Sequence, residues 1–165
     1  MTELAHNPSR RTVWLTFFGF VLACFAVSAI GGAVTATSVG TWYRELNKPG
    51  FTPPDGVFAP VWTTLYAMMA VAAWRVWRRV GFAGGRNALT LFGVQLAFNL
   101  AWSFLFFGFQ AIGWAFAEIL LLWGLILATI RVFVRIDRAA GLLLVPYLLW
   151  VTYAAALTGT IWHLN

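Results

Sequence analysis

Residues 112–134 read IGWAFAEILLLWGLILATIRVFV, and this uninterrupted apolar stretch decides the fold class. Its only charged residues are Glu118 and Arg131. An α-helix needs roughly 20 apolar residues to cross a hydrocarbon core of about 30 Å, so the stretch predicts a membrane-spanning helix. A transmembrane β-barrel would instead show short segments of alternating polarity. The backbone must therefore satisfy its hydrogen bonds within helices.

Four further apolar runs accompany this one, at about residues 13–39, 57–77, 88–107 and 139–162. Hydrophobic residues make up 61% of the chain and charged residues only 10%, whereas an average soluble domain carries roughly 25% charged residues. The sequence therefore predicts an all-α integral membrane protein, a five-transmembrane-helix bundle built as a single domain of residues 1–165. Residues 40–56 form the one long connection.

The basic residues predict how the bundle is oriented. Of the 11 Lys and Arg residues, only Arg44 and Lys48 fall on the side of the long connection. In an ordinary inner membrane, the positive-inside rule places the N-terminus in the cytoplasm and residues 40–56 outside. The residues do not distinguish a bacterial inner from an outer membrane. The net charge of +6 reflects this topology and contact with anionic lipid, and nothing indicates nucleic acid. The other side carries Arg10, Arg11, Arg75, Arg78, Arg79, Arg86, Arg131, Arg135 and Arg138.

The run at 88–107 carries a polar face. A polar side chain within hydrocarbon is costly, so each one is a functional candidate. Gln95 and Asn99 lie one helical turn apart and can hydrogen-bond a ligand, but hydrogen bonding between helices explains the two amides equally well. The role of Glu118 in the next run is also open, between a proton relay and a lone acid that either snorkels to the interface or is protonated and hydrogen-bonded. The face of the 88–107 helix consists of Gln95, Asn99, Trp102 and Phe106.

The opposite face of the same helix carries only small side chains. Gly93, Ala97 and Ala101 recur every four residues, and such a stripe lets another helix backbone approach closely. We expect this face to form the seam of a homodimer. Packing against a helix of the same subunit is the alternative.

Aromatic residues make up 18% of the chain and include candidate ligand contacts. A tryptophan near a helix end often anchors the helix at the membrane interface. Several that converge at one end of a bundle form flat walls for a planar apolar ligand. A zinc site or axial haem ligation by histidine is disfavoured, because His6 and His163 lie near the termini. A hydrolytic active site is disfavoured as well, because no Ser-His-Asp set can be assembled. The aromatic candidates are Trp42, Trp62, Tyr66, Trp102 and Trp150.

Several motifs occur in order along the chain: LNKP at 46–49, PVWTTLY at 60–66, QLAFNLAW at 95–102 and PYLLW at 146–150. Over about residues 15–163 the chain resembles the translocator protein family, also called tryptophan-rich sensory proteins or peripheral-type benzodiazepine receptors. The resemblance implies a usually dimeric five-helix bundle that binds porphyrins, haem-like tetrapyrroles, cholesterol and synthetic isoquinoline or benzodiazepine ligands. It also implies that residues 40–56, stiffened by prolines, form a lid over the pocket mouth.

The resemblance assigns roles to individual residues. Trp62 and Trp150 match the tryptophans linked in the family to porphyrin binding and to light-dependent porphyrin breakdown. Asn99 and Trp102 match pocket positions of the third helix. The further wall positions match Tyr66, Trp114 and Ala154.

The chain also departs from the family pattern. Phe51 stands where the lid usually has a tryptophan, and Gly56 replaces a frequent aromatic residue. Gly159 and His163 occupy positions where the cholesterol consensus of animal members has a tyrosine and a basic residue. The two lid residues imply a lid with less stacking surface. The two residues of the last helix argue against specific cholesterol recognition by that motif.

Three functional hypotheses follow. The preferred one is a membrane sensor or translocator that binds a porphyrin or haem, with no obligatory cofactor and no metal site, and thereby regulates tetrapyrrole or stress responses. The second is an enzyme that degrades porphyrins with light and oxygen, using tryptophans as redox groups without an acid-base set. The third is a small-molecule transporter of porphyrins or sterols. Membrane lipid and a second copy of the chain are the expected partners.

Overall fold

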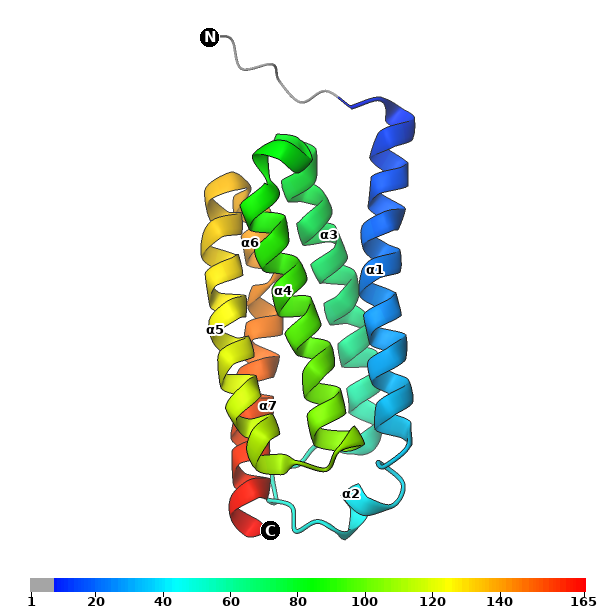
Figure 1. The fold of residues 1–165 in the computed structure, drawn as a ribbon, viewed down its shortest axis with the longest axis vertical. Coiled ribbons are helices and arrows are strands. Elements are labelled where there is room, and N and C mark those ends of the chain that lie inside the picture. The colour runs from blue at the N-terminus through cyan, green and yellow to red at the C-terminus, as the bar shows by residue number, and fades with distance from the viewer. Residues whose placement is uncertain (1–7) are drawn as a thin grey trace.

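The protein is an all-α bundle, described from residue 8 to residue 165 by a computed structural model (Figure 1). Five spans are long and apolar enough to cross a membrane, which confirms the predicted fold class. The long helices are α1 (Arg10–Ala36), α3 (Phe58–Gly84), α4 (Arg86–Ser103), α5 (Ile112–Ile136) and α7 (Val145–Leu164). The shorter elements are α2 (Trp42–Glu45), η1 (Asp55–Val57), η2 (Phe104–Gly108) and α6 (Arg138–Leu143).

The helix boundaries differ from the apolar runs for local reasons. The Ser9 hydroxyl accepts the Thr12 N–H at 3.2 Å, so α1 begins at Arg10 rather than at residue 13. Helix α3 continues past residue 77, because arginine is a good helix former and its long stem lets the charge reach water. The last span is divided at Leu144, and Pro146 lies in the first turn of α7, where its missing N–H costs nothing.

The end of α4 widens into one π-helical turn, η2. In this turn the Phe109 N–H donates to the Phe104 carbonyl at 2.7 Å, and Gln110 then adopts a positive φ of 55°. The wider turn lets two consecutive residues, Phe106 and Phe107, both become buried. π-Helical turns occur frequently at functional sites.

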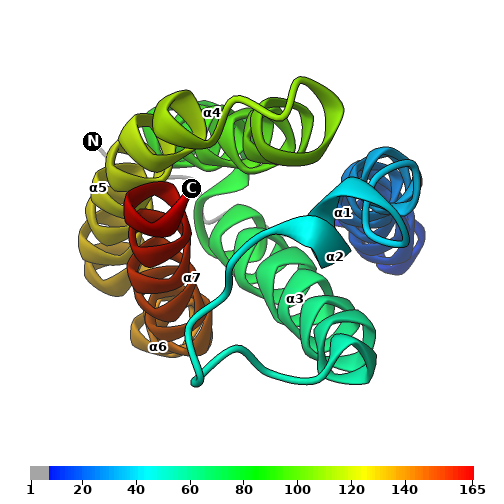
Figure 2. The same ribbon diagram turned by 90° about the horizontal axis from the view of Figure 1, so that it is seen from below.

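Helix α1 stands at the side of the bundle, against α3 and α4, while α5, α6 and α7 lie on the far side (Figure 2). Near its start α1 is held by Trp74 of α3, whose Nε1 donates to the Val13 carbonyl at 3.3 Å and whose ring meets Phe17 at 5.4 Å. Few residues of α1 are buried, and only Cys24 and Gly31 are fully covered. The other end of α1 is therefore free to border an open space.

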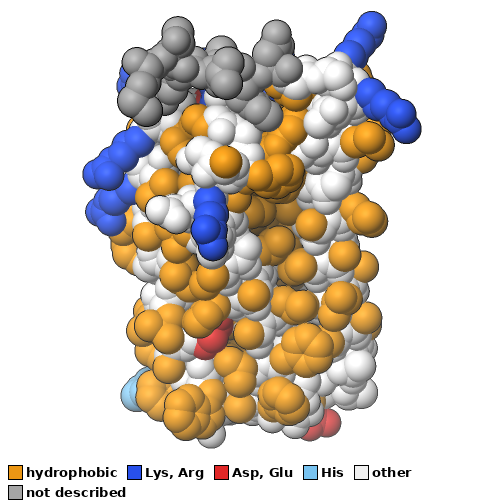
Figure 3. Space-filling view, turned by 45° about the horizontal axis from the view of Figure 1, so that its top comes forward, with side chains coloured by type: hydrophobic (Ala, Val, Ile, Leu, Met, Phe, Trp, Pro, Cys, Tyr) orange, Lys and Arg blue, Asp and Glu red, His pale blue; other side chains and the backbone are white. Residues whose placement is uncertain are grey.

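One end of the bundle, here called the arginine end, carries the exposed arginines of α1, α3 and α5, above a largely apolar surface (Figure 3). Asp137 organises this end by binding Arg75 at 2.9 Å and Arg79 at 3.2 Å, and by capping α6 through the Ala140 N–H at 3.0 Å. Burial raises the pKa of the Asp137 carboxyl, but these hydrogen bonds and charges outweigh burial and hold the pKa below its ordinary value. The position of this end in the cytoplasm stays a prediction.

Candidate functional site

A cavity of about 460 Å³ lies at the opposite end of the bundle, the lid end. Its walls come from the last turns of α1, the first turns of α3, the end of α4 with η2, and the middle of α7. The lid, residues 40–56, completes the lining at this end of the bundle with Gly40, Tyr43, Arg44 and Asp55. Small-molecule sites typically occupy roughly 300–1,000 Å³ and are largely apolar, so size and position indicate a ligand pocket.

The wall formed by α3 and α7 is aromatic. The Trp62 ring lies 5.6 Å from Tyr66 and 6.3 Å from Tyr147. The Trp150 ring lies 5.6 Å from Tyr153 and 5.9 Å from Phe58, which precedes Trp62 by one turn. Two helices thus present aromatic rings to the same cavity.

The facing wall belongs to α4 and η2. Here the Trp102 ring stacks on Phe106 at 5.1 Å with an interplanar angle of 16°, and Phe107 meets both of these rings edge-on. Most of the predicted ligand-binding residues line the cavity. They are Trp62, Tyr66, Asn99, Trp102, Phe106, Trp150 and Ala154.

The side of the pocket away from the lid, here called its floor, is polar, because three residues form a hydrogen-bond set there. The Tyr66 hydroxyl donates to Asn99 Oδ1, and Asn99 Nδ2 donates to the Tyr147 hydroxyl at 3.0 Å. Asn99 thereby links α3, α4 and α7 while also lining the cavity. Hydrogen bonding between helices, one of the two predicted roles, is what its amide does in this structure.

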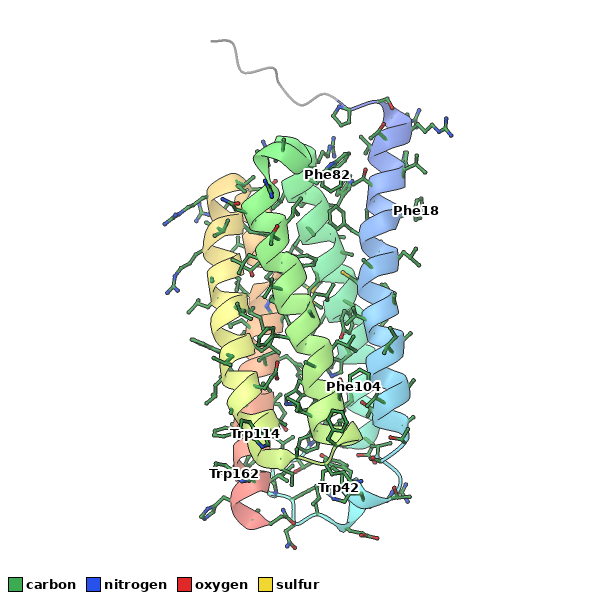
Figure 4. The ribbon with its side chains drawn as sticks, in the orientation of Figure 1. Phe18, Trp42, Phe82, Phe104, Trp114 and Trp162 are labelled. Atoms are coloured by element: carbon green, nitrogen blue, oxygen red, sulfur yellow. The ribbon has the colours of Figure 1, made fainter. Side chains whose placement is uncertain are left out.

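Three predicted ligand-binding residues lie elsewhere. Trp42 is on the lid and packs behind the wall, with its ring 5.7 Å from Phe106. Gln95 is buried between helices at 1% exposure, and its amide has no hydrogen-bond partner in the described part of the chain. The prediction of Trp114 as a wall residue is wrong here: it is 75% exposed and points away from the bundle (Figure 4), because α5 contributes no residue to the cavity.

The small-residue face of α4 is open. Gly93 and Ala97 are exposed and Ala101 is half-buried. A Cβ atom built on Gly93 would meet nothing within 4 Å. Packing within the subunit therefore does not explain the Gly93 and Ala97 part of this stripe.

The lid is fastened at several points. Just before it, the Ser38 hydroxyl donates to the Phe107 carbonyl at 2.7 Å. In its second half, the Tyr153 hydroxyl donates to the Phe51 carbonyl at 2.7 Å. The Asn47 N–H donates to Asn165 Oδ1 at 2.9 Å, which ties the lid to the end of α7.

Contacts of Lys48, here called the clasp, stabilise the first half of the lid. The Lys48 ammonium donates to the carbonyls of Tyr43, Arg44 and Leu46 at 2.7, 3.2 and 3.3 Å. It also lies 4.8 Å from the centre of the Tyr43 ring. The lid is therefore ordered over the cavity, and the charge of Lys48 stabilises the fold of the lid itself.

Sequence reasoning missed the contribution of α1. Ser28, Gly31, Gly32 and Thr35 line the cavity, and a Cβ atom on Gly31 would come within 3.1 Å of Ser103 Oγ. The spacing of these small residues, three to four apart around a Gly-Gly pair, was the available signal. Tyr153 was also missed, although it follows Trp150 by one turn. His6 lies outside the described residues, and His163 is exposed near the C-terminus.

Fold and pocket together define an integral, multi-pass membrane protein with five spanning helices and an aromatic ligand pocket under a polar lid. The chain belongs to the TspO/MBR family, which matches residues 20–163. The membership confirms the resemblance found in the motifs.

Relatives from bacteria and animals resemble this chain over nearly its whole length. The tryptophan-rich sensory protein of Cereibacter sphaeroides is 38% identical over 152 residues, covering 92% of each chain. The tryptophan-rich protein TspO of Chlorobaculum tepidum is 41% identical over 146 residues, covering 86% of this chain and 90% of the relative. The translocator protein of Ovis aries is 35% identical over 154 residues, covering 92% and 91%.

Proposed function

We propose that this membrane sensor or translocator binds a porphyrin or related flat tetrapyrrole, haem included, in the aromatic pocket, and that occupancy regulates tetrapyrrole or stress responses. One observation carries the proposal. Trp62, Trp102 and Trp150 come from three different helices and line the same cavity. Facing aromatic walls favour a flat apolar guest, since rings stack with a gain of about 0.5–1.5 kcal/mol each beyond burial.

The pocket is open on one side, so it can hold a ligand larger than its enclosed volume. Its lining includes exposed residues on two adjacent helices, namely Gly32 on α1 with Ala59 and Thr63 on α3. The pocket thus reaches the lipid-facing surface between α1 and α3. The edge of a macrocycle can extend there into an apolar surrounding without losing its contacts with the tryptophans.

The test is a titration of purified protein with protoporphyrin, followed by quenching of tryptophan fluorescence. The double variant Trp62→Ala, Trp150→Ala should bind at least about tenfold more weakly, because the loss of two stacking partners costs more than about 1.4 kcal/mol. Trp114→Ala is the matched control, since it removes an exposed tryptophan outside the pocket. Absence of saturable quenching, or equal affinity in the double variant, would refute the proposal.

Photochemical breakdown of the bound porphyrin is a second candidate function. It is favoured by the short spacing of redox-capable rings, 5.6 Å for both Trp62–Tyr66 and Trp150–Tyr153. Illumination of the complex under oxygen, with mass spectrometry of the products, tests it. Products that form at the same rate in a Trp62→Phe, Trp150→Phe variant would rule out a role for the protein.

We also propose that the open face of α4 is a homodimer seam. Gly93 and Ala97 offer a flat exposed stripe on which a second helix can pack closely. A leucine at either position should shift the protein from dimer to monomer in detergent, as measured by light scattering. Gly19→Leu is the control, because Gly19 on α1 is equally exposed and open. A dimer that survives both α4 substitutions contradicts the assignment.

A further inference from the structure

The two cations of the lid differ in what they bind. Lys48 is fully engaged, with three carbonyl groups and the Tyr43 ring around its ammonium. Arg44, four residues earlier, is exposed, and its guanidinium forms no hydrogen bond or ion pair with any residue between 8 and 165. The ion pairs found in that range belong to Arg75 and Arg79 at the other end of the bundle.

Arg44 also belongs to the pocket. Among the lining residues only Arg44 and Asp55 carry a formal charge, and both are on the lid. The helices contribute aromatic, aliphatic and small neutral side chains. The cavity is thus uncharged within the bundle and charged at its mouth beside the lid, where a bound ligand meets water.

The backbone that carries Arg44 is held in place. Its neighbour Tyr43 is 5% exposed and packs against Phe106 and Phe107 at 6.1 and 5.7 Å. Burial raises the pKa of the Tyr43 hydroxyl, and the negative charge of Asp55 raises it further. Arg44 therefore follows a fixed aromatic anchor directly, and Tyr43, Arg44 and Asp55 line the same cavity.

Resting on the proposed function, we propose that Arg44 is a specificity-determining residue that pairs with a carboxylate on the rim of a planar apolar ligand. The guanidinium presents parallel N–H donors that match the two oxygens of a carboxylate. The ring system of the ligand lies between the tryptophans, and its acidic substituent emerges beneath the lid. Asp55 repels a carboxylate, so we expect the acidic edge of the ligand to lie toward Arg44 and away from Asp55.

Protoporphyrin and its dimethyl ester share the macrocycle, and the ester carries two neutral methyl ester groups in place of the two carboxylates, so the pair tests this contact. Wild-type protein should bind the acid about fivefold more tightly than the ester at low salt, the size expected for an exposed ion pair. The preference should shrink as ionic strength rises, because salt screens exposed charges. Arg44→Gln should remove the preference and leave the affinity for the ester unchanged.

Three further variants separate charge recognition from lid structure. Arg86→Gln removes an exposed arginine at the arginine end and should keep the preference. Lys48→Met breaks the clasp of the lid and should weaken the acid and the ester by the same factor. Asp55→Asn should strengthen binding of the acid alone.

The outcomes distinguish the two proposals. If both ligands bind but wild type shows no preference, or if Arg44→Gln retains it, the role of Arg44 is wrong and porphyrin binding stands. If neither ligand binds to wild-type protein, the proposed function fails and this inference fails with it.

Discussion

Asn99 on α4 donates a hydrogen bond of 3.0 Å from Nδ2 to the Tyr147 hydroxyl on α7, while its Oδ1 accepts the Tyr66 hydroxyl from α3. One amide thus holds three helices together at the floor of the pocket. Replacement by leucine leaves two buried hydroxyl groups without this partner. We expect Asn99→Leu to lower the free energy of unfolding by about 1–3 kcal/mol, measured by thermal unfolding in detergent. Unchanged stability would show that the set is not structural.

Gln95 provides the opposite prediction from the preceding turn of the same helix. Both of its amide atoms are buried, and neither has a hydrogen-bond partner in residues 8–165. A buried polar group without a partner is unfavourable, so an apolar side chain of similar size removes a cost. Gln95→Leu should leave the unfolding temperature unchanged or raise it. A clear loss of stability would mean that the amide binds a water molecule or another group.

Asp137 predicts an acid-sensitive arginine end. Its pKa is lower in the folded protein than the ordinary value of 3.8, so the ion pairs contribute fully above that value. Their contribution is lost as the pH falls from the ordinary value of 3.8 toward the lower folded pKa, where the carboxylate becomes protonated. Unfolding curves of wild type and Asp137→Asn should therefore converge as the pH falls through this range.

The capping role of Asp137 can be separated from its charge. Asparagine keeps an oxygen that can accept the Ala140 N–H, whereas alanine does not. Asp137→Ala should cost about 1 kcal/mol more than Asp137→Asn at neutral pH. Equal losses in the two variants would assign the whole effect to the ion pairs.

Tyr153 predicts how firmly the lid holds a ligand. Its hydroxyl donates to the Phe51 carbonyl at 2.7 Å, and its ring meets Phe51 at 6.3 Å. Tyr153→Phe removes the hydrogen bond and keeps the ring. Because the bond contributes about 1 kcal/mol, its loss should raise the dissociation rate of a bound porphyrin roughly fivefold, measured by stopped-flow fluorescence. Dissociation at the wild-type rate would show that lid opening does not limit release.

Gly31 predicts the limit on side-chain size where α1 meets α4. A Cβ atom there would lie 3.1 Å from Ser103 Oγ and 3.7 Å from Leu100 Cδ1. A leucine must either push α1 away from α4 or fill the cavity, so Gly31→Leu should weaken ligand binding by at least about tenfold. Gly19→Leu on the exposed face of α1 gains the same helix propensity and should bind normally.

The amino-acid sequence by itself determined the membrane class, the number of spans and the two faces of α4. Lipid offers no hydrogen bonds, so each apolar run of sufficient length must form a helix. Residues 112–134 alone are enough to assign the chain to the helical membrane proteins. A helix also fixes which residues share a face, so Asn99, Trp102 and Phe106 had to lie on one side. Five spans and a shared face follow from these rules without any tertiary contact, whereas which members of the face line the cavity does not, since Gln95 is buried outside it.

Only the tertiary structure decided how each helix is rotated and which groups meet. Trp114 and Trp150 look alike in sequence, yet one is exposed on α5 and the other lines the cavity, because packing of neighbouring helices selects the buried face. Gln95 and Asn99 are both buried amides, and the hydroxyls of Tyr66 and Tyr147 reach only Asn99. Lys48 binds carbonyl groups of the lid, whereas the Arg44 guanidinium has no partner among residues 8–165, for the same reason. The partners come from the folded backbone, and local sequence does not specify distances between segments.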